Sequence, residues 1–181
     1  MITLNSDAAS TSLSKTTKAI LNEYGIKLNK NLGQNYLIDR NKRDQIIQFG
    51  NLTKDDVVLE IGPGIGTLTI ELAKRVKKVI AIEQDSNICQ ILENRLKKEN
   101  IDNVELINDD ALNVEFPKFD KIISNLPYQI SSPITFKFLN YDFQLAILMY
   151  QKEFASRMNG KVGSKNYSRL SAMLYLSLIH I

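Results

Sequence analysis

The sequence is short of several residue types whose presence would define a class of protein. It contains a single cysteine, Cys89, which excludes an internal disulfide and therefore a disulfide-stabilised secreted scaffold. Cys89 falls on the apolar face of an expected helix, so we predict that it is a packing residue. The one histidine, His180, lies in a closing segment to which we assign no role, and we predict no metal site.

Long apolar runs are also missing. No run approaches the roughly 20 residues that a membrane-spanning helix needs. The polar N-terminus lacks the apolar core of a secretory signal. The composition, 44% hydrophobic and 24% charged over 181 residues, is typical of one globular domain. We therefore expect a monomeric cytoplasmic protein with no membrane partner.

Acidic residues are scarce at both ends of the chain. Residues 1–43 carry a net charge of +4 and residues 121–181 a net charge of +5, whereas residues 44–120 carry −6. The basic ends would form a footprint for a polyanion if they shared one face of the fold. Scattered, solvated lysines are an equally good interpretation of composition alone.

Apolar segments alternate with helical patterns through most of the chain. Strands are predicted over residues 56–62, 78–85, 103–109, 119–125 and 143–150, and helices over 66–76, 86–100, 132–141 and from 151. Apolar strands separated by helices predict a doubly wound, mainly parallel α/β sheet covered on both faces. Before it, one helix should end at Gly25, and a second, capped by Asp39, should turn Ile46, Ile47 and Phe49 inward.

The last predicted strand has no later strand to pair with. Its apolar edge would be exposed, which proteins normally avoid, so we expect the chain to be truncated. We expect a basic extension with one helix over residues 1–30 and an incomplete domain over residues 31–181.

The stretch "LEIGPGIGTLT" follows the first strand and opens a helix. Gly62, Gly64 and Gly66 would let the backbone turn tightly and approach a ligand. The dinucleotide fingerprint G-x-G-x-x-G requires glycine where Thr67 stands, which argues against a nicotinamide-dependent oxidoreductase. E-x-G-x-G-x-G, which begins at Glu60, is instead the pattern of class I methyltransferases, whose cofactor S-adenosylmethionine is cationic and carries no phosphate.

Acidic residues follow the next two strands. Glu83 ends the second strand, where a carboxylate accepts hydrogen bonds from the ribose of an adenosine. Asp85 is a better candidate for the cap of the following helix. After the third strand, we predict that Asp110 contacts the edge of the adenine ring, with Asp109 as the alternative.

The fourth strand leads into Asn125, Leu126, Pro127 and Tyr128. The lone pair of an exocyclic base nitrogen is delocalised into the ring. The Asn125 carbonyl and a backbone carbonyl near Leu126–Pro127 could hold that nitrogen and offset its developing charge. Pro127 would stiffen the turn, and Tyr128 would stack on the base.

These motifs resemble the ribosomal RNA adenine N6,N6-dimethyltransferases, which methylate two adjacent adenines near the 3′ end of small-subunit ribosomal RNA. The resemblance is carried by "NLGQNYLID", "LEIGPGIGTLT", "NLPYQISSP" and "QKEFASRM…KNYSRLS", over residues 31 to 171. It implies a class I methyltransferase (Rossmann-like) fold and the small ribosomal subunit or its precursor as partner. In the family, further strands and a small helical domain follow, and Tyr36 stands where phenylalanine is common.

The resemblance also implies roles for single residues. The cofactor contacts of the family fall on Asn35, Leu37, Gly62, Glu83, Asp110 and Asn125. Its RNA-facing segment implies phosphate contacts for Lys161, Lys165 and Arg169.

Other functions remain open at this point. One is a macrolide-resistance-type methylase of large-subunit rRNA, and another is methylation of DNA adenine or of a protein glutamine amide. A non-catalytic RNA-binding assembly factor with the same fold is the third.

Overall fold

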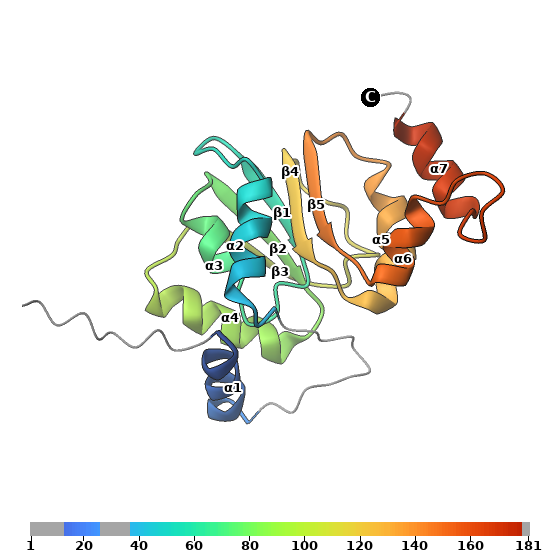
Figure 1. Cartoon of the computed structure of the whole chain (residues 1–181). Helices are drawn as coiled ribbons and strands as arrows, with labels where there is room; N and C mark the ends of the chain where they lie inside the picture. The colour runs from blue at the N-terminus through green and yellow to red at the C-terminus, as the bar shows by residue number, and fades with distance from the viewer. Residues whose placement is uncertain (1–12, 26–36, 179–181) are drawn as a thin grey trace, which may run out of the picture.

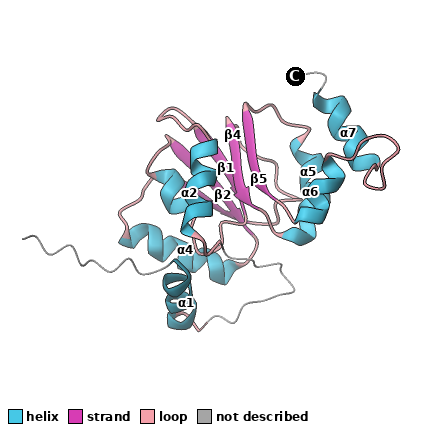
Figure 2. Cartoon of the chain, viewed as in Figure 1, coloured by secondary structure: helices cyan, strands magenta, loops and turns pink. Residues whose placement is uncertain are grey.

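The computed structural model describes residues 13–25 and 37–178. Its centre is one five-stranded sheet in the order β3-β2-β1-β4-β5, and every neighbouring pair is parallel (Figures 1 and 2). The strands are β1 Val57–Ile61, β2 Lys78–Glu83, β3 Val104–Asn108, β4 Lys121–Asn125 and β5 Leu145–Met149. The reversal of strand order beside β1 is where a doubly wound sheet forms its ligand-binding crevice.

The helices cover both faces of this sheet. They are α1 Leu13–Glu23, α2 Arg40–Phe49, α3 Thr69–Ala73, α4 Ser86–Lys98, α5 Ser131–Phe138, α6 Lys152–Met158 and α7 Arg169–Leu178, with a 3-10 turn at Tyr128–Ile130. None of the helices within the described ranges has the length and hydropathy of a membrane span.

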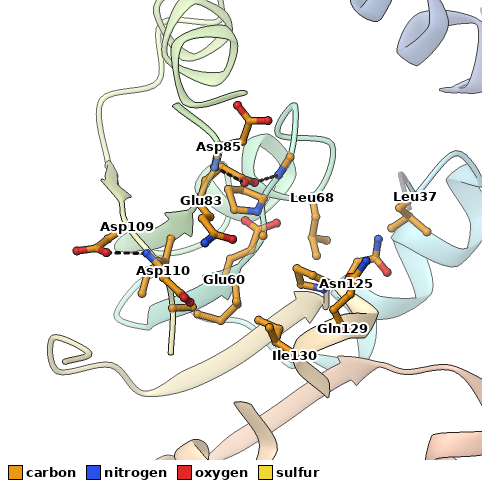
Figure 3. A pocket seen from close by; sticks show the side chains of 18 of the residues that line it. Leu37, Glu60, Leu68, Glu83, Asp85, Asp109, Asp110, Asn125, Gln129 and Ile130 are labelled. Atoms are coloured by element: carbon orange, nitrogen blue, oxygen red, sulfur yellow. Dashed lines mark hydrogen bonds between the residues drawn. The ribbon is translucent and has the colours of Figure 1, made fainter. Parts of the chain in front are cut away.

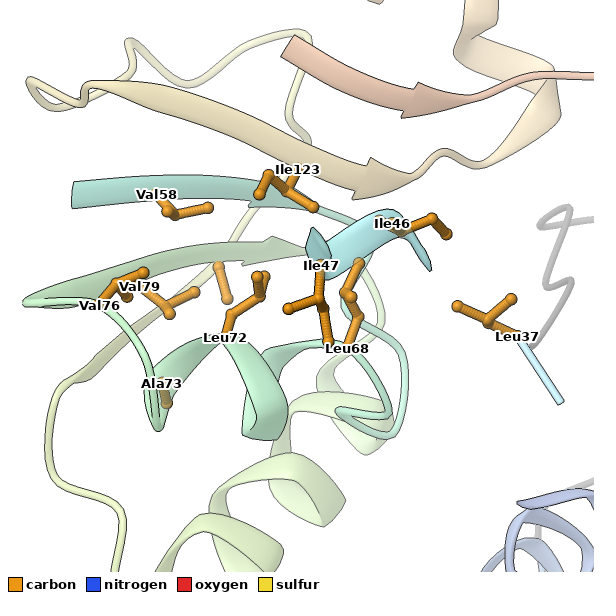
Figure 4. Packing of buried hydrophobic residues seen from close by; sticks show 11 residues of the cluster. Leu37, Ile46, Ile47, Val58, Leu68, Leu72, Ala73, Val76, Val79 and Ile123 are labelled. Carbon is orange, nitrogen blue, oxygen red and sulfur yellow. The ribbon is translucent and has the colours of Figure 1, made fainter. Parts of the chain in front are cut away.

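Successive strand residues pack into different cores. Val58 faces the cluster beneath α2 and α3, which also holds Ile47 and Leu72 (Figure 4). Leu59, the next residue, faces the cluster beneath α5. Because side chains alternate along a strand and helices cover both faces of the sheet, consecutive strand residues can both be apolar and buried, as Val58 and Leu59 are. The predicted doubly wound fold is confirmed.

Strands β1 and β4 separate at their carboxyl ends. Only Val58 and Leu59 of β1 are in register with β4. Beyond them the buried Ser124 hydroxyl donates to the carbonyl of Ile61 (2.6 Å), and the Ile61 amide donates back to it (3.3 Å). A side chain thus replaces the backbone ladder, so the strands can part without leaving these groups unpaired.

The helix caps predicted at Asp39 and Gly25 are confirmed, but the buried position predicted for Phe49 is not. Asp39 accepts hydrogen bonds from the amides of Asn41 and Lys42, and Gly25 ends α1 with a positive φ of 63°. The prediction that Phe49 points inward is wrong, because its side chain is 65% exposed. Phe49 is the last residue of α2; at 100° per residue it lies about 60° around the helix from the buried Ile46 but about 160° from the buried Ile47, so it falls outside the centre of the buried face.

The open edge predicted for the last strand is present. Within residues 13–25 and 37–178, β5 pairs with β4 alone, and all five of its residues are only half-buried. Nearer the start of the chain, α1 packs on the domain through Leu21, which belongs to one buried cluster with Ile65 of the glycine loop and Ile88 and Ile91 of α4.

Candidate active site

A pocket of about 240 Å³ opens at the carboxyl ends of the strands (Figure 3). The glycine loop, the ends of β2 and β4 and the segments that follow them form its walls. Its lining includes Leu37, Glu60, Gly62, Gly64, Leu68, Glu83, Asp85, Asp109, Asp110, Asn125, Pro127, Gln129 and Ile130. Residues predicted from four separate motifs therefore meet in one cavity.

The glycine loop lies against the Asn-Leu-Pro-Tyr segment. Gly62 has a φ of 68°, and a Cβ atom there would stand 2.9 Å from Cγ of Pro127. Gly66 has a φ of 85°, and a Cβ on it would overlap Leu92 of α4. Both positions require glycine for conformation and for space. Arg95 of α4 also holds the glycine loop in place, because its guanidinium donates a hydrogen bond to the Ile65 carbonyl.

Glu83 ties the end of β2 to this loop. Its carboxylate accepts from the amides of Gly64 (3.2 Å) and Asp85 (3.1 Å), one on each oxygen. Burial raises the pKa of Glu83, although these two hydrogen bonds oppose the shift. Each oxygen keeps a further acceptor site for a ligand hydroxyl. Asp85 caps α4 by accepting from Asn87 and Ile88, as its position predicted.

The loop after β3 carries two acids into the pocket. Asp110 is half-buried and accepts from the amide of Leu112 (2.9 Å), whereas the exposed Asp109 accepts from the amide of Asp110 (2.7 Å). Lys137 of α5 fastens this loop by donating to the carbonyls of Ala111 (2.9 Å), Leu112 (3.1 Å) and Val114. Sequence reasoning missed Lys137, which lies 25 residues from Leu112.

The four residues of the Asn-Leu-Pro-Tyr segment take different positions. Asn125 ends β4 and lines the pocket together with Pro127. The Leu126 side chain is buried in the core beneath α5, so only its backbone is available to a ligand. Tyr128 is half-buried at the start of the 3-10 turn and is not a lining residue.

The element before α2 reaches the same pocket through Leu37, which is 8% exposed. Periodicity had not indicated this position, which came from the family resemblance alone. Asn35 lies outside the described residues.

The described residues that line the pocket include five acids and no lysine, arginine or histidine. The acids are Glu60, Glu83, Asp85, Asp109 and Asp110. An acidic lining favours a cation and disfavours a pyrophosphate. This set of acceptors therefore fits S-adenosylmethionine, with Glu83 and Asp110 available to adenosine and the glycine loop beside them.

The predicted phosphate-binding residues lie outside the pocket. Lys161 and Lys165 are exposed in the loop between α6 and α7, and Arg169 begins α7. The Arg169 guanidinium lies 5.9 Å from the ring centroid of Phe136 in α5.

Residues 25–178 match the family model for ribosomal RNA adenine dimethylase. The chain belongs to this family. It is 58% identical over 158 residues to a probable ribosomal RNA small subunit methyltransferase A of Methanosphaera stadtmanae, and 56% identical over 159 residues to that of Methanothermobacter thermautotrophicus. These alignments cover 87% and 88% of the chain, which spans 58% and 57% of the two relatives.

Solved structures agree with this family assignment. A dimethyladenosine transferase from Plasmodium falciparum is 44% identical with a TM-score of 0.69, covering 74% of this chain and 49% of that one. The 23S rRNA methyltransferase ErmE is 34% identical with a TM-score of 0.68, covering 78% and 57%. The Rossmann-like fold of class I methyltransferases is therefore confirmed for this chain.

Proposed function

We propose that this protein uses S-adenosylmethionine to dimethylate the N6 amino groups of two adjacent adenines near the 3′ end of small-subunit ribosomal RNA. The observation that carries the proposal is the acidic pocket between the glycine loop and Asn125, in a member of the rRNA adenine dimethylase family. The names of the relatives support the small subunit as substrate. We also propose that it acts as a monomer in the cytoplasm.

The pocket residues divide between the cofactor and the target base. S-adenosylmethionine supplies a methyl group activated by its positively charged sulfur. We assign Asn35, Leu37, Gly62, Gly64, Glu83, Asp110 and Asn125 to the cofactor and Asn125, Leu126, Pro127 and Tyr128 to the base. The Asn125 carbonyl accepts a hydrogen bond from the adenine N6 amino group and stabilises its developing positive charge. The proton leaves after transfer, so no strong general base is required.

A second substrate is favoured by one observation. ErmE, whose name gives 23S rRNA as its substrate, has nearly the same TM-score as the dimethyladenosine transferase. Large-subunit rRNA is therefore the alternative target. A non-catalytic RNA-binding role is the alternative to both.

The decisive experiment incubates the protein and S-adenosylmethionine with undermethylated small subunits or, separately, with large-subunit rRNA. We expect N6,N6-dimethyladenosine in digests of the small subunit alone, detected by mass spectrometry. Product from the large subunit alone would favour the alternative target. Cofactor and RNA binding without product on either substrate would favour the non-catalytic role.

We propose that Lys161, Lys165 and Arg169 bind RNA phosphates. Replacing all three with alanine should weaken RNA binding and lower the slope of log affinity against log salt by about 2 to 3, since each contact releases about one counterion. Filter binding at several salt concentrations measures both effects. The matched control replaces Lys97 and Lys98, which are equally exposed in the last turn of α4, at the other end of the molecule (Figure 1). The control removes two positive charges and the test variant three, so an equal loss per charge removed would mean that the effect reflects net charge alone.

A further inference from the structure

Glu60 is a buried acid that the proposed reaction has not used. It lies in β1 one residue before the last of that strand, with only 2% of its surface exposed, and it lines the pocket (Figure 3). Its Oε2 atom is buried and has no hydrogen-bond partner among the described residues. A buried carboxyl oxygen without a partner is unfavourable, so this oxygen is a binding position that a ligand can fill.

The surroundings of Glu60 keep its carboxyl group neutral. Burial raises its pKa to about 8, the nearby Thr69 side chain opposes part of this shift, and the charge of Glu83 adds to it. Among the described residues, the other ionisable groups that line the pocket are Asp85, Asp109 and Asp110, which are also acids. In the free protein at neutral pH, the carboxyl group is therefore protonated.

We propose that Glu60 receives the positive charge of the ligand and ionises when that ligand binds, so that binding releases a proton to solvent. The O–H bond of the carboxyl group breaks, the proton passes to the buffer, and the carboxylate left behind is paired with the ligand cation. The identity of the ligand, S-adenosylmethionine, rests on the proposed function. The proton release depends on the burial and isolation of Glu60.

The direction of the pH dependence follows from this linkage. Below pH 8 the free protein holds a proton that the complex has lost, so affinity rises with pH. The dissociation constant should fall about tenfold per pH unit between pH 6 and 7, and it should level off above pH 8.

Isothermal titration calorimetry in buffers of different ionisation enthalpy counts the protons exchanged. At pH 6.5 we expect release of about one proton per S-adenosylmethionine bound to the wild-type protein. Glu60→Gln, which has the shape of the neutral acid, should bind without this release and with an affinity that changes less with pH. A contribution from the amino group of the ligand is common to both proteins and cancels in their difference.

The matched control is Asp55→Asn, the same acid-to-amide change in the exposed turn before β1, which should release protons as the wild type does. Infrared spectroscopy of the free protein should show a protonated carboxyl band at pH 6.5 that is missing in Glu60→Gln. An ionised Glu60 in the free protein, or unchanged proton release in Glu60→Gln, overturns the proposal and leaves the proposed function intact. If S-adenosylmethionine does not bind to the wild-type protein, both fail. If the variant does not fold, the protonated carboxyl band of the wild-type protein decides, because it should be lost at pH 6.5 when S-adenosylmethionine binds.

Discussion

Replacing Asn125 with alanine is expected to reduce methyl transfer by at least about 100-fold while leaving RNA binding nearly unchanged. The side chain stands at the end of β4 in the pocket, where its carbonyl can accept from the target amino group. Loss of an acceptor aimed at a developing charge lowers the rate of transfer more than it weakens binding, because the charge is largest in the transition state.

The measurement compares single-turnover methylation with filter binding of the same RNA. Asn140→Ala is the control, because Asn140 is an exposed asparagine just beyond the end of α5 and outside the pocket. It should methylate and bind RNA as the wild type does. Normal transfer by Asn125→Ala would overturn the proposed role of Asn125. A parallel loss of RNA binding would place Asn125 in substrate binding instead.

Replacing Lys121 with methionine is expected to cost about 3 to 5 kcal/mol of unfolding free energy. Lys121 donates to Asp56 at 2.9 Å and to the carbonyl of Asn51 at 2.7 Å, and both side chains of the ion pair are 7% exposed. Burial alone would raise the pKa of Asp56, but the Thr53 amide and the Lys121 ammonium group lower it below its ordinary value. Without Lys121, a carboxylate with little access to water loses its countercharge.

Urea unfolding gives the free energy of unfolding of each variant, and a comparison with an exposed ion pair separates the effect of burial from that of ion pairing. Lys78 makes a 2.6 Å ion pair with Glu105, but these side chains are 45% and 41% exposed, so Lys78→Met should cost no more than about 1 kcal/mol. Adding Asp56→Asn to Lys121→Met should recover part of the loss, because the unpaired charge is removed. Equal costs for the two lysine variants would contradict this account. The Asp56–Lys121 pair lies at the amino ends of β1 and β4, away from the pocket, so the folded variant should still bind cofactor.

Local features were predictable because they depend on residues that are close in sequence. Asp39 and Asp85 cap the helices that follow them, since a short acid before a helix accepts from its first free amides. Gly62, Gly64 and Gly66 all take positive φ, as a tight turn at the end of a buried strand requires. The failure at Phe49 arose because hydrophobicity alone does not say which side of a short helix end meets the core.

Other features depend on which strands become neighbours. Ser124 bonds to Ile61 across 63 residues, and Lys121 pairs with Asp56 across 65, only because β4 lies beside β1. The same pairing sets Pro127 against Gly62. The packing of α5 likewise places the Leu126 side chain in the core, whereas the neighbouring Asn125 side chain faces the pocket.

The sequence by itself determined the α/β fold, the glycine loop, the acids at the strand ends and the Asn-Leu-Pro-Tyr segment, and hence the family. The tertiary structure alone decided that Glu60 lines the pocket with an unpaired oxygen and that Lys137 secures the loop after Asp110. Periodicity and spacing report interactions within a few residues of chain. Burial, the loss of a hydrogen-bond partner and the shift of a pKa arise from segments that meet only when the sheet is assembled.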